Sequence, residues 1–491
     1  MILIKKVLPV TILLCLIGCG AENENKNKPN NHPILSQTTL EGIWYSRDYG
    51  EIKLIEAQQV TSLQVTNNAC FPTFTLDPYS LINANSELIN DSLIYNRPSD
   101  STSVKYRRLY DINEVCTAGM TPSLDDGDSY SFDAQQVFSS FWHDMNTHYA
   151  FFKQRDVNWA QVYSDYYDAL GGASEDGLKK VFSEILAQLN DGHTSITVGA
   201  SLDSDDISFT EKPELRVQLH TEAVELGLDF EQQQQYVISQ QELIIKNISE
   251  YLTDESKVTF LNRHNSNLIN EEHMINWGII EKNGQRTGYL AFDGFMNFYE
   301  REGIEWADIA PSNIKFNQLM EQIFKQLANT ERLILDIRNN GGGLDMQGLQ
   351  LVRRFLSEEI TAWNISAFYQ GNLYFQDKVK AQPHSGRRYL KPVSVLISSG
   401  TFSAAETFSM VMQNLPQVTM IGEATGGGTS DTMSRLLPNH WWFGLSNEYY
   451  QDSEGENFEV RGVQPDINVS AYDIELRAQG RDSAIEAALN L

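Results

Sequence analysis

Residues 393–406 read VSVLISSGTFSAAE, and this stretch decides the fold class. Four of its first five residues, Val393–Ile397, are apolar, and such a short run is typical of a strand buried on both faces of a sheet. Small and polar residues then lead into 404–413, whose spacing predicts a helix. A buried strand that passes through a short turn into a helix indicates an α/β core.

The same alternation extends outward from this stretch. We expect strands at 288–292 and 332–337, and helices at 317–327 and 346–356. Continuous apolar strands that alternate with helices indicate a layered structure with a largely buried sheet. The α/β core is therefore expected to span residues 276–491.

Three further units are expected before this core. Residues 39–122 contain short alternating runs separated by turn clusters, which predicts a small antiparallel β domain. Residues 130–200 follow helical spacing and are expected to be a helical domain. Residues 201–275, which include a Gln-rich piece, are expected to be a mostly helical insertion. The aromatic cluster at 441–443 favours a β core, with the lining of a substrate cleft as the alternative.

The first residues are expected to direct export. Residues 1–18 contain two lysines followed by an apolar run too short to span a bilayer stably, as in a signal peptide. The run ends in Leu-Ile-Gly-Cys, which resembles a bacterial lipobox in which Cys19 is acylated. The alternative is an ordinary cleaved signal. Residues 19–38 are polar and predict a disordered tether. We expect a lipid-anchored protein of the bacterial cell envelope, in the outer membrane and facing the periplasm or the cell surface.

Charge and cysteine usage narrow the possible partners. With 37 basic and 65 acidic residues, the chain of 491 residues has a formal charge of −28, which argues against binding nucleic acid. We expect neither a metal nor a cofactor.

Beyond the signal region only Cys70 and Cys116 remain, and in an oxidising compartment we expect them to form a disulfide. A reactive thiol is the alternative.

Three segments have residues suited to acyl transfer. Ser403 follows a buried strand in the first turn of a helix, where unpaired backbone N–H groups favour negative charge. A plain N-cap serine is the alternative interpretation. The run Gly341-Gly342-Gly343 would let backbone amides approach a substrate carbonyl, although a tight turn explains it too. His193 lies in Asn-Asp-Gly-His after a helical region, and a structural histidine is its alternative.

Together with the tail EVRGVQPD at 459–466, these segments resemble the tricorn and C-terminal-processing-protease family of serine peptidases. The resemblance covers 131–199 and 277–469, and it implies a crotonase-like (ClpP/crotonase) α/β core. It also implies that Ser403 is the nucleophile, three residues before the motif glutamate. The oxyanion would then be stabilised by the amides of Ala404 and of Gly341 or Gly342.

The sequence departs from the better-known branch of this family. That branch uses a lysine where this chain has Gly428, whereas the tricorn-like branch uses a histidine that matches His193. In the tricorn-like branch Glu459 resembles the acidic member of a catalytic tetrad, but the serine expected before the histidine is replaced by Gly192. No PDZ module is recognisable. The resemblance implies a serine endopeptidase, of the carboxy-terminal-processing type, that hydrolyses peptides or unfolded protein segments. The alternative function is a non-catalytic envelope lipoprotein of the same fold that binds a peptide or a hydrophobic ligand.

Overall fold

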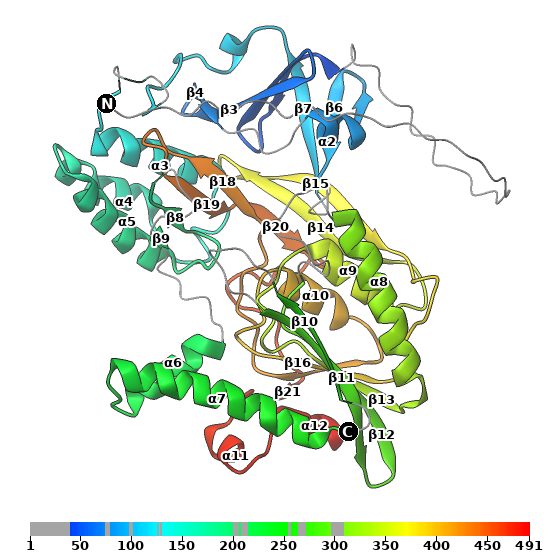
Figure 1. Ribbon diagram of the computed structural model, residues 1–491. Helices are drawn as coiled ribbons and strands as arrows, with labels where there is room; N and C mark the ends of the chain where they lie inside the picture. The colour runs from blue at the N-terminus through cyan, green and yellow to red at the C-terminus, as the bar shows by residue number, and fades with distance from the viewer. Residues whose placement is uncertain are drawn as a thin grey trace, which may run out of the picture.

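A computed structural model of the chain describes residues 40–73, 79–97, 102–124, 127, 130–199, 206–207, 215–253, 257–263, 272–295 and 309–491. The predicted signal peptide, Cys19 and the predicted tether lie outside the described residues. Figure 1 shows a β layer at the top, a helical layer on the left, and an α/β core in the lower half of the view.

The N-terminal unit is an antiparallel sheet in the order β4-β3-β2-β1-β7-β6-β5. The strands are β1 (Gly42–Ser46), β2 (Glu51–Glu56), β3 (Gln59–Thr66), β4 (Ala69–Thr73), β5 (Ser86–Ile89), β6 (Ser92–Asn96) and β7 (Ser103–Leu109). Asn67 and Asn68 both have positive φ, as in the two-residue turns that match the twist of a hairpin. A helix, α2 (Tyr79–Ala84), and a 3-10 turn, η1 (Ile112–Glu114), complete this part. A disulfide joins Cys70 in β4 to Cys116, with the two Cα atoms 5.4 Å apart.

The helical layer contains α3 (Ala134–His148), α4 (Trp159–Tyr166) and α5 (Glu175–Leu189), with a 3-10 turn, η3 (Asp168–Leu170), between α4 and α5. Asp133, Asn158 and Ser174 cap the three helices. The layer packs on a sheet of order β18-β19-β8-β9, whose strands are β18 (Thr432–Leu436), β19 (Trp442–Ser446), β8 (Ile196–Thr197) and β9 (Asp206–Ile207). Trp441 and Phe443 are buried in the shared core, whereas Trp442 is half-buried. The helical layer is therefore built together with strands from the C-terminal part of the chain.

The segment expected to be mostly helical is helical only in its middle. It contains α6 (Leu215–Glu225) and α7 (Phe230–Tyr251), which pack on one another and on α11 (Ile474–Ala478). After α7 the chain forms β10 (Val258–Arg263) and then β11 (Glu272–Lys282), which add two antiparallel strands to the core sheet. Helical periodicity did not reveal β10, because a six-residue strand depends on its pairing partner more than on its own propensity.

The core sheet has the order β10-β11-β12-β13-β16-β17-β21 and is parallel from β12 onward. Its remaining strands are β12 (Gln285–Phe292), β13 (Arg332–Asp336), β16 (Val393–Ile397), β17 (Val418–Gly422) and β21 (Ile467–Asn468). One face packs on α8 (Ile309–Gln326), α9 (Asp345–Val352) and α10 (Ala404–Met412), and the other face packs on α7 and α12 (Ser483–Leu489). A 3-10 turn, η5 (Leu327–Asn329), follows α8. The expected α/β organisation is present, and the crotonase-like arrangement stays a prediction.

A fourth sheet and a buried ion pair connect these layers. The sheet is ordered β15-β14-β20, and its strands are β14 (Ile360–Tyr369), β15 (Asn372–Ala381) and β20 (Glu448–Gln451). Arg435 of β18 pairs with Asp144 of α3 at 2.6 Å and donates to the carbonyls of Tyr49 and Val65. Because this buried guanidinium contacts both α3 and the N-terminal sheet, it fixes the N-terminal sheet against the helical layer.

Candidate active site

Ser403 lies in the turn between β16 and α10, beyond the carboxyl end of a parallel strand. Its backbone has φ 57° and ψ −125°, in a region that residues other than glycine rarely adopt. Thr401 Oγ1 donates to the carbonyl of Ile337 at 2.9 Å, and the N–H of Phe402 donates to the carbonyl of Asn340 at 3.0 Å. Ser403 occupies the N-cap position, but its side chain makes no capping hydrogen bond. The hydroxyl is therefore left for another partner.

That partner is His193, whose Nε2 lies 3.0 Å from Ser403 Oγ. Helix α5 ends at Leu189, its C-cap Asn190 adopts a left-handed conformation, and a turn at Asp191 follows. The N–H of His193 donates to Asp191 Oδ1 at 2.9 Å, which fixes the backbone that carries the imidazole. The structure thus brings together two of the predicted residues from different layers.

The glycine run lies against the same turn. A side chain at Gly342 would place its Cβ 2.6 Å from Ser403 Cβ and 3.0 Å from the amide nitrogen of Ala404, and Gly342 also has φ +105°. The N–H of Gly342 donates to Asn340 Oδ1 at 3.0 Å, whereas no atom lies within 4 Å of a Cβ placed on Gly341. Ala404 is the first residue of α10, so its N–H has no acceptor within the helix. The sequence predicts the N–H of Gly341 or of Gly342 as an oxyanion donor. In the structure, the N–H of Gly342 donates to Asn340.

Glu459 is buried, and its carboxylate binds Arg155, Thr429 and Ser430. Oε2 accepts hydrogen bonds from the N–H of Thr429 (2.7 Å), the hydroxyl of Thr429 (3.0 Å) and the N–H of Ser430 (3.1 Å). Oε1 accepts from Arg155 at 2.8 Å. Within the described part of the chain, neither oxygen bonds to Ser403 or His193. Burial, with Asp191 nearby, raises the pKa of Glu459 to about 7 despite the charge of Arg155.

Arg155 links Glu459 to the histidine loop. Its guanidinium lies 3.7 Å from Asp191 Oδ1 and also donates to the carbonyls of Leu189 and Asn190, at the end of α5. Asp191 in turn accepts a hydrogen bond from the hydroxyl of Tyr149 at 2.8 Å. Burial would raise the pKa of Asp191, but the charges of Arg155 and His193 and the hydrogen bonds to it lower that pKa below its usual value.

Glu406, in the first turn of α10, holds the loop on the other side of the site. Its carboxylate accepts hydrogen bonds from the hydroxyl of Thr425 (2.6 Å) and from the N–H groups of Gly427 (2.7 Å) and Gly428 (2.6 Å). Burial raises the pKa of Glu406 to about 7 in spite of these donors. Glu406 and Glu459 thus fix the loop 425–430 from its two ends.

Residues 286–469, which include Ser403 and Glu459, match the model of Peptidase family S41. The chain carries a peptidase family S41 domain. This confirms the family resemblance predicted from the sequence motifs. His193 and Arg155 lie before the matched segment, in the helical layer that packs against the S41 domain.

Two curated relatives are carboxyl-terminal-processing proteases. The protein from Picosynechococcus sp. is 26% identical over 213 residues, which are 43% of this chain and 46% of the relative. The protein from Synechocystis sp. is 28% identical over 185 residues, which are 37% of this chain and 38% of the relative. The chain therefore spans less than half the length of these relatives. The crystal structure of a candidate peptidase from Parabacteroides merdae is 24% identical with a TM-score of 0.55, and the match covers 73% of this chain and 96% of that one. This similarity supports the fold.

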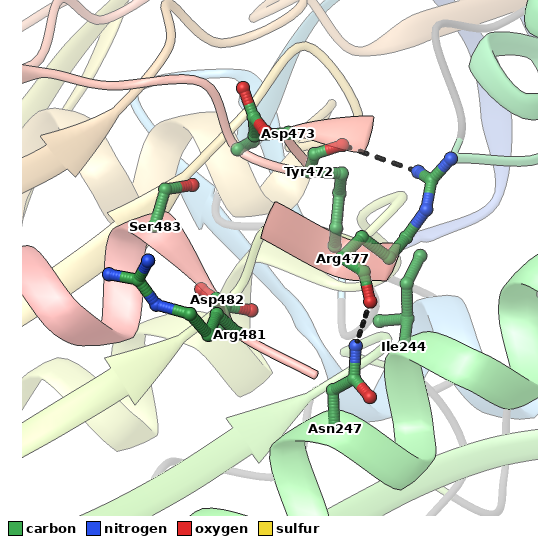
Figure 2. A pocket seen from close by; sticks show the side chains of 9 residues that line it. Ile244, Asn247, Tyr472, Asp473, Arg477, Arg481, Asp482 and Ser483 are labelled. Atoms are coloured by element: carbon green, nitrogen blue, oxygen red, sulfur yellow. Dashed lines mark hydrogen bonds between the residues drawn. The ribbon is translucent and has the colours of Figure 1, made fainter. Parts of the chain in front are cut away.

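A hollow elsewhere in the chain is not part of this site. Figure 2 shows it between α7, α11 and the start of α12, where Asn247 donates to the carbonyl of Arg477. The charged side chains that line it have partners, since Arg477 pairs with Glu222 and Asp482 pairs with Arg338. We interpret this hollow as a joint between helices.

Two further properties concern the described residues only. No group of three or more His, Cys, Asp or Glu side chains there is placed to hold a metal ion. None of the helices in those ranges has the length and apolar character needed to cross a membrane.

Sequence reasoning missed Arg155, Asp191 and Tyr149 as members of the site. Asp191 stands two residues before His193, so its place in the same motif was the available signal. Arg155 and Tyr149 lie in the loop between α3 and α4 and carry no motif, because their role arises from tertiary packing.

Proposed function

We propose that the protein is a serine peptidase that cleaves peptides or unfolded protein segments through an acyl-enzyme on Ser403, with His193 as general base. The observation that carries this proposal is the 3.0 Å contact between Ser403 Oγ and His193 Nε2. A hydroxyl is a weak nucleophile until a neighbouring base accepts its proton, and this distance allows that transfer.

The reaction would proceed in two steps. Ser403 Oγ attacks the scissile carbonyl while His193 Nε2 takes its proton, and the oxyanion that forms is stabilised by backbone N–H groups. The amides of Ala404 and Gly341 are the donors that we assign, because Gly342 already donates its N–H to Asn340. His193 then protonates the leaving amine, and the acyl-enzyme forms. A water molecule deprotonated by His193 hydrolyses the ester and regenerates Ser403.

We assign Glu459 a positioning role that acts through Arg155. The ion pair Arg155–Glu459 and the contact of Arg155 with Asp191 connect the S41 domain to the loop that carries His193. This arrangement would hold the imidazole at the distance at which it can accept the serine proton. Loss of one oxyanion donor typically lowers kcat by about 10²–10³-fold. Misplacement of the general base also lowers kcat, because the base acts only at the correct distance from the serine hydroxyl.

The proposed substrate class is supported by the two relatives, which are named carboxyl-terminal-processing proteases. We propose that the tricorn-like use of histidine distinguishes this chain, since the position of the lysine in the other branch is held by Gly428. We also propose that the protein acts in the bacterial cell envelope, attached to the membrane through Cys19. The disulfide between Cys70 and Cys116 supports an oxidising compartment.

The test is digestion of a diverse peptide library by the mature soluble chain, read by mass spectrometry beside Ser403→Ala and His193→Ala. We expect cleavage by the unaltered chain and its loss in both variants. Ser409→Ala, in the middle of α10, is the matched control and should still cleave. Full activity of Ser403→Ala would refute the assignment. Absence of cleavage together with binding of a peptide or a hydrophobic ligand would favour the non-catalytic alternative.

Attachment is tested separately by labelling cells with radioactive fatty acid. The label should appear on the full-length protein and disappear in Cys19→Ser. An unlabelled protein that fractionates with the soluble periplasm would overturn the lipid anchor without affecting the peptidase proposal.

A further inference from the structure

Phe402, the residue before Ser403, is buried between the two loops of the site. Its side chain is 3% exposed, and its ring centroid lies 4.8 Å from that of His193, with the two ring planes at 42°. Aromatic rings attract one another at this separation, and a buried aromatic side chain also restricts how its neighbours can move. The backbone of Phe402 is fixed by the hydrogen bond from its N–H to Asn340. The ring is therefore a rigid support beside the imidazole.

Two glycines, one in each loop, face this ring. A Cβ on Gly192 would lie 2.5 Å from Phe402 Cζ, and a Cβ on Gly428 would lie 2.4 Å from both Cε2 and Cζ. Neither glycine has the positive φ that would itself demand glycine. The backbone of both residues would thus accept alanine, and the contact with the Phe402 ring excludes it.

We propose that Phe402 is a positioning residue for His193, and that residues 192 and 428 must be glycine because its ring occupies the space their side chains need. The ring acts as a spacer between the histidine loop and the loop 425–430, which Glu406 and Glu459 hold. This inference rests on the proposed function, because positioning matters only if His193 serves Ser403.

The proposal predicts a specific dependence between residues 402 and 428. In the unaltered background, Gly428→Ala should push the ring against His193 and lower kcat by about 10–100-fold, the scale of loss for a displacement of about 1 Å, with little change in KM. Leucine lacks the Cε and Cζ atoms that meet the added methyl group. In a Phe402→Leu background, Gly428→Ala should therefore cause no further loss of kcat.

The experiment is a double-mutant cycle of Phe402→Leu and Gly428→Ala, repeated with Gly192→Ala. Gly171→Ala is the matched control, because its Cβ would meet no atom closer than 3.5 Å and its φ is −59°. Each variant is measured for kcat, for KM and for its thermal midpoint. The rate at which a fluorophosphonate labels each variant is also measured. In this reaction Ser403 Oγ bonds to phosphorus, fluoride leaves, and His193 takes the proton. We expect kcat and the labelling rate to fall together while KM stays constant.

The outcomes separate this inference from the proposed function. Equal losses from Gly428→Ala in both backgrounds, or no loss in either, would overturn the inference while leaving the peptidase proposal intact. If the unaltered chain neither cleaves peptides nor is labelled, the proposed function fails. The thermal midpoints still test the steric clash between residue 428 and the Phe402 ring. Gly428→Ala must lower the midpoint when Phe402 is present and leave it unchanged in the Phe402→Leu background. A midpoint that falls equally in both backgrounds contradicts it.

Discussion

A guanidinium nitrogen of Arg155 lies 2.8 Å from a carboxylate oxygen of Glu459, and 304 residues separate the two along the chain. Arg155 belongs to the helical layer, whereas Glu459 belongs to the S41 domain. Because the same guanidinium also lies near Asp191, one buried cation is shared between two buried carboxylates. The pair therefore ties the loop of His193 to Thr429 and Ser430, which Glu459 also binds.

Removal of this cation should damage both stability and catalysis. Arg155→Met leaves Asp191 and Glu459 buried without their counter-ion, so we expect the free energy of unfolding to fall by about 3–5 kcal/mol and kcat to fall with it. Denaturant unfolding and peptide cleavage measure the two effects. Adding Glu459→Gln to Arg155→Met should recover part of the stability, since one uncompensated charge is removed.

The matched control is Arg461→Met. Arg461 pairs with Glu456 at the surface, where both side chains are at least half exposed, and an exposed ion pair contributes about 0–1 kcal/mol. If Arg155→Met were as mild as Arg461→Met, the proposed role of Arg155 would have to be abandoned.

The sequence allowed prediction of those features that lie within one local segment. The strand Val393–Ile397 and the turn to α10 are visible in residues 393–406, because apolar continuity and helix spacing are local properties. Ser403, His193 and the glycine run were selected through short motifs. The structure brings these residues together in one site.

The remaining features depend on distant contacts. The family resemblance implied that Glu459 is the acidic member of a catalytic tetrad, but its partner Arg155 could not be predicted because nothing in the sequence pairs residues of different layers. The sharing of one sheet by β8, β9, β18 and β19 was missed for the same reason. A strand such as β8, with two residues, carries no periodicity of its own.

The buried carboxylate of Glu406 should make stability depend on pH. Burial raises its pKa from 4.5 to about 7, so the folded protein holds this proton more tightly than the unfolded chain does. The contribution to stability is then fully present below about pH 4.5 and is lost as the pH rises to about 7. We expect the difference in free energy of unfolding between the unaltered protein and Glu406→Gln to fall across this window, by up to about 3 kcal/mol.

Denaturant unfolding at several pH values between 4 and about 8 measures this difference. Glu225→Gln, in which the substituted side chain is exposed, is the control and should leave the pH dependence unchanged. A constant difference between the unaltered protein and Glu406→Gln would show that Glu406 ionises normally.

The disulfide should stabilise the N-terminal sheet without affecting the active site. Cys70 and Cys116 are 46 residues apart, and a cross-link over a loop of this size restricts the unfolded chain by about 4 kcal/mol. In Cys70→Ala/Cys116→Ala we expect the N-terminal layer to unfold at a lower temperature, while fluorophosphonate labelling of Ser403 at 25 °C stays unchanged. Dithiothreitol should lower the midpoint of the unaltered protein but not that of the variant. Loss of labelling in the folded variant would instead show that the N-terminal layer supports catalysis.

The backbone of Ser403 should store strain that its own replacement can release. At φ 57° and ψ −125° a residue with a Cβ is disfavoured by about 1–3 kcal/mol, whereas glycine adopts this conformation readily. Ser403→Gly and Ser403→Ala both lose the hydroxyl and the hydrogen bond to His193, so their difference isolates the backbone. We expect Ser403→Gly to be more stable than Ser403→Ala by about 1 kcal/mol, after the greater flexibility of glycine in the unfolded chain is included.

The matched pair is Ser409→Gly and Ser409→Ala in the middle of α10. There the glycine variant should be the less stable one, because glycine costs about 1 kcal/mol in a helix. The same order at both positions would mean that the turn at Ser403 is unstrained.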